Sequence, residues 1–108
     1  MSESDLAIFQ IIAAAGTARS KFMEAVAAAK RGAFDEVDRL MAEGEESFLT
    51  SHDQHASLLQ QAASEEGLSV TLMHVHAEDQ LMCAEEFKII AQEFIDLYRR
   101  VSVVRTQE

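Results

Sequence analysis

One stretch of the chain decides its organisation: Leu72-Met73-His74-Val75-His76-Ala77-Glu78-Asp79-Gln80-Leu81-Met82-Cys83. Treated as a helix, it has a face that continues toward the C-terminus in steps of three and four residues, the spacing that stacks side chains in one stripe. Eight of the ten side chains in that stripe are apolar or thiol. The pattern predicts a long helix from about residue 70 to the low 100s, with this stripe in a core: Leu72, His76, Asp79, Cys83, Phe87, Ile90, Phe94, Leu97, Val101 and Val104.

Two polar residues, His76 and Asp79, lie in this otherwise apolar stripe. An ionised carboxylate without a partner in an apolar environment costs several kcal/mol or more. Something must offset that cost. The pair is therefore the first candidate for a functional site.

The composition favours helices and a single domain over residues 1–108. The chain has no proline and four glycines, and 48% of its residues are hydrophobic, a mix that favours helix over sheet. A single cysteine excludes an internal disulfide framework and suits a reducing cytosol. No apolar run reaches the roughly 18 residues of a membrane span. We expect a cytoplasmic protein without direct membrane insertion.

The net charge is strongly negative, with nineteen acidic residues against nine basic ones and a sum of −10. Neutralising phosphates requires clustered lysines and arginines, so the charge argues against nucleic acid as a partner. A basic protein partner would be steered toward such a surface. The alternative, that the acidity only keeps the domain soluble, stays open.

The first helix is predicted to begin near Ser2, Ser4 and Asp5 and to stop at Lys30-Arg31-Gly32, where cations precede a glycine. Further apolar residues (Leu6, Phe9 and Ile11) lie off its main stripe. A helix that is apolar nearly all round is covered on more than one side, and we expect another subunit to supply the extra cover. The main stripe is Ile8, Ile12, Ala15, Ala18, Phe22, Val26 and Ala29.

The second helix is predicted to begin near Phe34 and to end at a turn over residues 64–67, with Ser69 or Thr71 capping the third helix and a frayed tail at residues 105–108. Three helices joined by short turns predict an all-α, antiparallel up-down-up bundle. A second apolar row on the last helix (Val75, Met82, Ile89) again favours self-association. The buried row of the second helix should contain Phe34, Val37, Met41, Gly44, Phe48, His52, His55, Leu59 and Ala62.

His76 has several possible roles. A neutral imidazole is a nucleophile that can accept a phosphoryl group, a metal ligand, or a hydrogen-bonded core residue. Asp79, three residues later, lies on the same helical face and could orient the ring or share a metal ion. If the last two helices are adjacent, His52 and His55 could converge with this pair as an intrasubunit metal site. Cys83 shares the face and is expected to behave as a small hydrophobe.

The local sequence resembles a known family. The segment Val75-His76-Ala77-Glu78-Asp79-Gln80-Leu81-Met82 is similar to the signature Val-His-Ala-Gln-Asp-His-Leu-Met of the lactose/cellobiose-class enzyme IIA proteins of the bacterial sugar phosphotransferase system. The likeness covers about residues 6–98 and includes four further segments in the same order: Gly16-Thr17-Ala18-Arg19-Ser20, Ala28-Ala29-Lys30-Arg31-Gly32-Ala33-Phe34, Leu58-Leu59-Gln60-Gln61-Ala62 and Leu97-Tyr98.

The resemblance implies a fold, a reaction and partners. The fold would be a three-helix bundle assembled as a homotrimer. His76 would accept a phosphoryl group from the histidine-containing phosphocarrier protein and pass it to a cysteine of the matching enzyme IIB during sugar uptake. Asp79 would meet its two symmetry mates on the trimer axis, where a divalent cation such as Mg²⁺ would offset their repulsion. No organic cofactor is implied.

Four residues near the predicted site depart from the family pattern: Gln80 replaces a histidine, Glu78 a glutamine, His55 a glutamine and Cys83 a threonine. Gln80 can still donate a hydrogen bond to a phosphoryl oxygen but cannot carry charge. Two alternatives therefore stay open beside the phosphocarrier. One is a non-transport paralogue that acts as a regulatory interaction module, and the other is a metal-binding bundle built from the histidines and Asp79.

Overall fold

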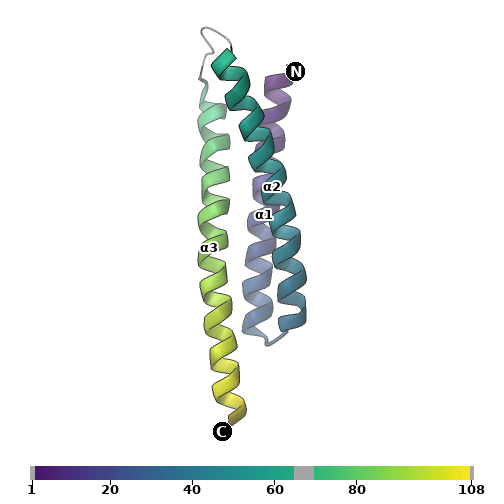
Figure 1. The fold of residues 1–108 in the computed structure, drawn as a ribbon, viewed down its shortest axis with the longest axis vertical. Helices are drawn as coiled ribbons and strands as arrows, with labels where there is room; N and C mark the ends of the chain where they lie inside the picture. The colour runs from purple at the N-terminus through teal and green to yellow at the C-terminus, as the bar shows by residue number, and fades with distance from the viewer. Residues whose placement is uncertain (1, 65–69, 108) are drawn as a thin grey trace.

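The computed structural model describes residues 2–64 and 70–107, and these residues form three helices without a strand. The helices are α1 (Glu3–Lys30), α2 (Phe34–Ser64) and α3 (Leu72–Gln107). Figure 1 shows α1 and α3 running in one direction and α2 in the other, which confirms the predicted antiparallel up-down-up arrangement. The molecule is a rod with extents of 65 × 19 × 17 Å. No helix within the described ranges is long and apolar enough to cross a membrane.

The helix boundaries follow from local chemistry. Ser2 caps α1 in a reciprocal box, because its hydroxyl accepts from the Asp5 backbone N–H at 3.1 Å and its own N–H donates to the Asp5 carboxylate. Gly32 ends the turn after α1 with a φ of 82°, a conformation that side chains with a Cβ adopt rarely. α3 continues to Gln107, so the predicted frayed tail was wrong for residues 105–107. Most of the predicted turn at residues 64–67, and the alternative cap Ser69, lie outside the described residues.

The core is organised around α1, which packs against both other helices, whereas α2 and α3 contact each other much less. The predicted stripe of α1 is confirmed at its main positions, since Ile8, Ala15, Ala18, Phe22 and Ala29 are buried. Ile11, which the pattern placed off the stripe, is fully buried as well. Leu6 and Phe9 stay about half exposed, as expected for a helix with apolar surface beyond its own core.

Two small residues of α2 set its distance from α1. A Cβ on Gly44 would lie 2.5 Å from Cε1 of Phe22, so only glycine leaves room for that ring. Ser51 is fully buried, and its hydroxyl donates to the Ile11 carbonyl oxygen at 2.9 Å. This hydrogen bond between the helices satisfies the buried hydroxyl and fixes the register of α1 against α2.

Most of the apolar stripe predicted for the core of α3 faces outward instead, whereas Phe87 is partly buried and packs against the core. The side chains that α3 buries within the chain are small or come from a different row: Ala77, Leu81, Ala84, Ala91 and Ile95. The alanines at intervals of seven residues allow α1 to approach α3 closely. The other large apolar side chains of the predicted stripe are 43–82% exposed, which corrects the prediction for the isolated chain: Leu72, Ile90, Phe94, Leu97, Val101 and Val104.

Candidate functional site

His76 and Asp79 are exposed side chains near the beginning of α3. α3 begins at the end of the rod opposite the α1–α2 turn (Figure 1). Their spacing of three residues places them on one side of the helix, as predicted. Both are exposed within the chain, so the expectation of a buried pair was wrong for a single subunit. An exposed carboxylate is hydrated, and within one chain Asp79 therefore carries no burial penalty.

The surroundings of this pair are apolar and open. Leu72, Val75 and Met82 are each more than half exposed, so the two polar side chains lie on an apolar surface rather than in a pocket. Such a face suits a protein partner better than a small molecule.

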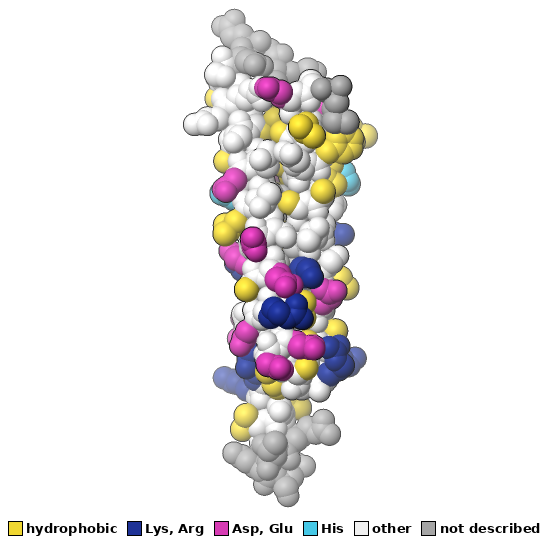
Figure 2. Space-filling view, turned by 90° about the vertical axis from the view of Figure 1, so that its right-hand side faces the viewer, with side chains coloured by type: hydrophobic (Ala, Val, Ile, Leu, Met, Phe, Trp, Pro, Cys, Tyr) yellow, Lys and Arg dark blue, Asp and Glu magenta, His cyan; other side chains and the backbone are white. Residues whose placement is uncertain are grey.

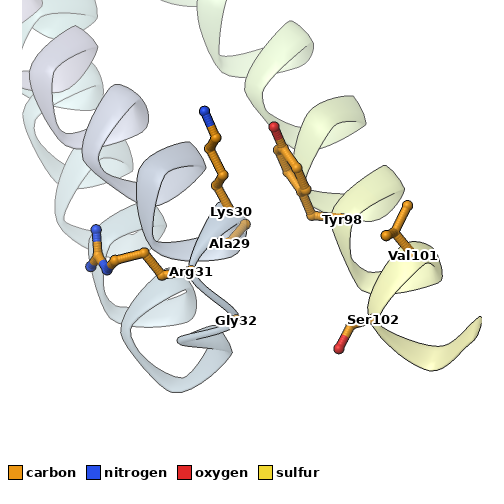
Figure 3. A pocket seen from close by; sticks show the side chains of 7 residues that line it. All are labelled: Ala29, Lys30, Arg31, Gly32, Tyr98, Val101 and Ser102. Atoms are coloured by element: carbon orange, nitrogen blue, oxygen red, sulfur yellow. The ribbon is translucent and has the colours of Figure 1, made fainter. Parts of the chain in front are cut away.

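A surface cavity of about 470 Å³ lies at the other end of the rod. Figure 3 shows it between the α1–α2 turn and the C-terminal part of α3, with Lys30 of α1 and Tyr98 of α3 among the residues that line it. The cavity contains none of the candidate residues, so it does not define the site. Its lining is Ala29, Lys30, Arg31, Gly32, Tyr98, Val101 and Ser102.

Gln80 lies one turn beyond His76 and is partly buried. Its amide can donate a hydrogen bond to an oxygen atom held at His76. The neighbouring charges are negative, since Glu78 and Asp79 are both exposed on α3. The sequence has no lysine or arginine between Arg39 and Lys88. The site therefore has little positive charge of its own for a bound anion.

The cations gather in the other half of the molecule. Figure 2 shows most of the lysine and arginine side chains of the visible face in its lower half, which carries the α1–α2 turn. Several of them are paired with carboxylates, including Arg31 with Glu36 at 3.0 Å and Arg99 with Asp38 at 3.2 Å. Charge is thus distributed unevenly along the rod, with the half that holds His76 poorer in cations.

The two histidines of α2 do not join His76. His52 is exposed, with its ring 6.2 Å from that of Phe48 and its Nδ1 3.8 Å from the Asp53 carboxylate. The predicted buried row was therefore wrong at His52 and at Leu59, which is 57% exposed, whereas His55 is partly buried. Within residues 2–64 and 70–107, no three His, Cys, Asp or Glu side chains come close enough to hold a metal ion. The hypothesis of an intrasubunit site from His52, His55, His76 and Asp79 is wrong.

A single chain also offers too few ligands for a cation at Asp79. The Cys83 thiol lies 4.0 Å from Oδ1 of Asp79, but Mg²⁺ prefers oxygen ligands in octahedral geometry. One carboxylate on an open helical face does not form such a site. Asp79 fits a hard cation only if further copies of the chain bring their own carboxylates to it.

The sequence reasoning missed the role of His74. Thr71 caps α3, as one of the two predicted alternatives, and its hydroxyl accepts from the His74 backbone N–H at 3.4 Å. In return, Nδ1 of His74 lies 3.2 Å from the Thr71 backbone nitrogen and 2.7 Å from its hydroxyl. This is a capping box with histidine in the position that glutamate or glutamine usually takes. The spacing Thr-x-x-His immediately before the helix was the signal.

Comparison with known proteins identifies the family. A family model described as PTS system, lactose/cellobiose-specific IIA subunit matches residues 6–99. The chain belongs to this family. It is 39% identical over 103 residues to the lichenan-specific phosphotransferase enzyme IIA component of Bacillus subtilis, covering 95% of this chain and 94% of that protein.

Further relatives agree with this assignment. The lactose-specific EIIA component of Staphylococcus epidermidis is 36% identical over 100 residues, which cover 93% of this chain and 96% of that protein. The crystal structure of the cellobiose-specific enzyme IIA from Bacillus anthracis superimposes with a TM-score of 0.90 at 36% identity, over 95% of this chain and 94% of that one. The lactose/cellobiose IIA protein described here is thus a phosphotransferase component with a phosphotransfer role in sugar uptake.

Proposed function

We propose that His76 is the phosphoryl acceptor of this IIA protein. It would receive the phosphoryl group from the histidine-containing phosphocarrier protein and pass it to a cysteine of a lactose/cellobiose-type enzyme IIB. The observation that carries the proposal is the exposed imidazole on the outward, apolar face of α3, within the residues that match the family. A nucleophile that serves two protein partners in turn has to be reachable from outside.

The transfer needs little chemistry from the protein itself. An imidazole nitrogen of His76 attacks the phosphorus of the donor phosphohistidine in line, so that one N–P bond forms while the donor N–P bond breaks. The enzyme IIB thiolate then attacks the same phosphorus and forms an S–P bond as the His76 N–P bond breaks. Positioning and exclusion of water govern such transfers, and the apolar surface around His76 provides both when a partner covers it.

The charges around His76 indicate what each partner must supply. A phosphohistidine here would be close to Glu78 and Asp79, in a part of the sequence without lysine or arginine. Gln80 can donate a hydrogen bond to a phosphoryl oxygen but adds no positive charge. Both the donor and the acceptor would therefore bring cationic groups to the patch, and opposite charge would steer them to it.

We extend the proposal to a homotrimer formed through the outward face of α3. Its large apolar side chains follow helical spacing from Leu72 to Val104 and are uncovered within one chain, as in helices that associate along a shared stripe. Asp79 lies in that stripe, so three copies would bring three carboxylates together. A divalent cation such as Mg²⁺ would be held by these carboxylates and would neutralise their repulsion.

A regulatory role outside transport is the second candidate. Gln80, Glu78, His55 and Cys83 replace residues that the family usually has around the acceptor. A paralogue that binds a regulator through its acidic surface could lose the second histidine and tolerate added negative charge near His76. Such a protein would retain the bundle but accept phosphate poorly.

The deciding experiment is intact mass after incubation with phosphoenolpyruvate, enzyme I and the phosphocarrier protein. We expect the wild type to gain one phosphoryl group and His76→Gln to gain none while keeping its helical content and assembly. His52→Gln is the matched control, because it removes another exposed histidine without touching the patch. Labelling of the His76→Gln protein at another residue would refute the acceptor assignment, and a wild type that stays unlabelled would favour the regulatory module.

A further inference from the structure

The cavity between the α1–α2 turn and the C-terminal part of α3, which we call the turn cavity, differs in chemistry from the surface around His76. Its volume of about 470 Å³ is in the range of small-molecule sites. Its lining includes one unpaired cation, Lys30, and two hydroxyl groups, from Tyr98 and Ser102, but no acidic side chain. In a chain with nineteen acidic residues, this is a surface whose wall does not repel an anion.

The polar groups of the turn cavity are available to a ligand. Among the described residues, the Lys30 ammonium has no ion pair, and the hydroxyls of Tyr98 and Ser102 have no hydrogen bond. Arg31 also lines the cavity, but its guanidinium pairs with Glu36 at 3.0 Å. Figure 3 shows the Arg31 side chain directed away from α3. Lys30 is therefore the cation that a ligand in the cavity would meet.

Two helices bring these groups to the cavity. Figure 3 shows Lys30 on α1 and Tyr98 on α3, with the cavity between the two helices. Ser102 lies one turn beyond Tyr98, and this spacing places both hydroxyls on one side of α3. Tyr98 is partly buried and packs against the core, whereas Lys30 is exposed. The phenol thus has a fixed place, and the flexible ammonium can turn toward a ligand.

The end of α1 opposes an anion less than an uncapped helix end would. The partial negative charge of a helix C-terminus comes from carbonyl groups without a hydrogen-bond partner. Here the carbonyl oxygens of residues 27–29 accept from the backbone N–H groups of residues 31–33 at 2.9–3.2 Å. The positive φ of Gly32 allows the chain to close this turn. These carbonyl groups therefore do not cancel the charge of Lys30.

We infer that the turn cavity binds a small phosphorylated sugar. The phosphate dianion accepts charge-assisted hydrogen bonds from the Lys30 ammonium, and the sugar hydroxyls exchange hydrogen bonds with Tyr98 and Ser102. The apolar face of the sugar ring lies against the Tyr98 ring and the side chains of Ala29 and Val101, which line the same cavity. The cation alone would attract any anion, and the two hydroxyls give the preference for a polyol.

This inference goes beyond phosphoryl transfer at His76, because the turn cavity is at the other end of the rod. A phosphotransfer reaction coupled to sugar uptake yields phosphorylated sugar, and the chain is a component of such a system. A site for this class of molecule would let the protein bind a product of the uptake that it serves. Binding does not depend on which residue accepts the phosphoryl group.

The test is a calorimetric titration of the wild type with glucose 6-phosphate, glucose and inorganic phosphate at about pH 8, where the phosphate group is dianionic. We expect glucose 6-phosphate to bind at millimolar concentration, about tenfold or more tightly than either of the other two. Equal affinity for inorganic phosphate would show a general attraction for anions and would overturn the inference. Absence of glucose 6-phosphate binding at millimolar concentration would overturn it as well.

Matched substitutions locate the site. Lys30→Met should weaken glucose 6-phosphate binding by about tenfold or more, because it removes a charged partner, and Tyr98→Phe by about fivefold, because it removes a neutral one. Lys21→Met is the control, since it removes a cation of α1 that does not line the cavity. Circular dichroism checks that all three variants fold. An equal loss of affinity in Lys21→Met and Lys30→Met would contradict a site in the turn cavity.

A second readout does not use affinity. Glucose 6-phosphate should slow amide hydrogen exchange in residues 29–33 and 98–104, because the ligand joins the turn to α3, and should leave residues 72–80 unchanged. If His76→Gln still accepts phosphate, the proposed function fails, but these exchange data continue to test the turn cavity. Protection of residues 72–80 alone would place the ligand near His76 and would overturn the inference.

Discussion

The two apolar faces of α3 differ in the size of their side chains, and this difference separates two kinds of packing. The inner face has alanines at intervals of seven residues, together with Leu81 and Ile95, and is buried against the rest of the chain. The outer face has larger side chains, such as Phe94 and Leu97, and is about half exposed. Small residues thus mark the contact between helices of one chain, where α1 comes close. The larger ones lie on the surface that the proposed trimer would cover.

The largest expected effect comes from a matched pair of isoleucines on these faces. Ile95→Ala removes a fully buried side chain and should lower the free energy of unfolding by about 2–5 kcal/mol, because the cavity cannot collapse fully. Ile90→Ala, at a position that is 48% exposed, should weaken association instead. Thermal unfolding over a range of protein concentrations distinguishes them. An Ile90→Ala effect independent of concentration would contradict the proposed interface.

The next largest effect is expected for trimer assembly when Asp79, the acidic residue on the outer face of α3, is replaced. Asp79→Leu should keep or strengthen the trimer in the presence of a chelator, because an apolar side chain removes the repulsion between carboxylates; such replacements often stabilise by about 1–4 kcal/mol. Sedimentation velocity with and without Mg²⁺ measures this, and the wild type alone should respond to the cation. Complete loss of assembly in Asp79→Leu would count against a carboxylate cluster on the axis.

Smaller changes in stability are expected at two glycines, one packed against another helix and one with open space around it within the chain. Gly44→Ala places a Cβ against the Phe22 ring and should destabilise the fold by about 1–3 kcal/mol through overpacking. Gly16→Ala has open space around it within the chain and should stabilise α1 by about 0.5–1 kcal/mol. Chemical denaturation of both variants checks the signs. A destabilising Gly16→Ala would place that position in a contact between chains.

The smallest expected effect is a change in the pKa of a surface carboxyl group between α1 and α2. The hydrogen bond from the Lys21 ammonium, at 3.2 Å, lowers the pKa of the Glu43 carboxyl, with a further contribution from Arg39. A lowered pKa stabilises the fold at pH values above the ordinary value of the carboxyl, and this contribution disappears as the pH falls through the lowered value. Lys21→Met should therefore raise the pKa of Glu43 in an NMR titration. An unchanged pKa would assign the shift to Arg39 alone.

The sequence pattern predicted the three helices, their order and most of their ends, because capping residues, Gly32 and apolar periodicity act locally. It failed on the inner face of α3, since alanine gives a weak hydrophobic signal and Leu72 or Phe94 a strong one. Single-chain periodicity cannot distinguish a core stripe from a stripe that another subunit covers. The pairing of His76 with Asp79 followed from spacing alone, whereas the exposure of His52 depended on tertiary packing. His74 was missed because histidine is an uncommon member of a capping box.

The narrow cross-section of the molecule has a consequence for the lifetime of a phosphorylated state. A rod 19 Å by 17 Å across hides only the side chains that lie between its helices, and His76 is exposed on the outward face of α3. On the proposed function, hydrolysis of the bound phosphate would be slowed by neighbouring molecules rather than by the chain that holds it. The lifetime of the N–P bond on His76 would then measure how often, and how completely, another protein molecule covers that side chain.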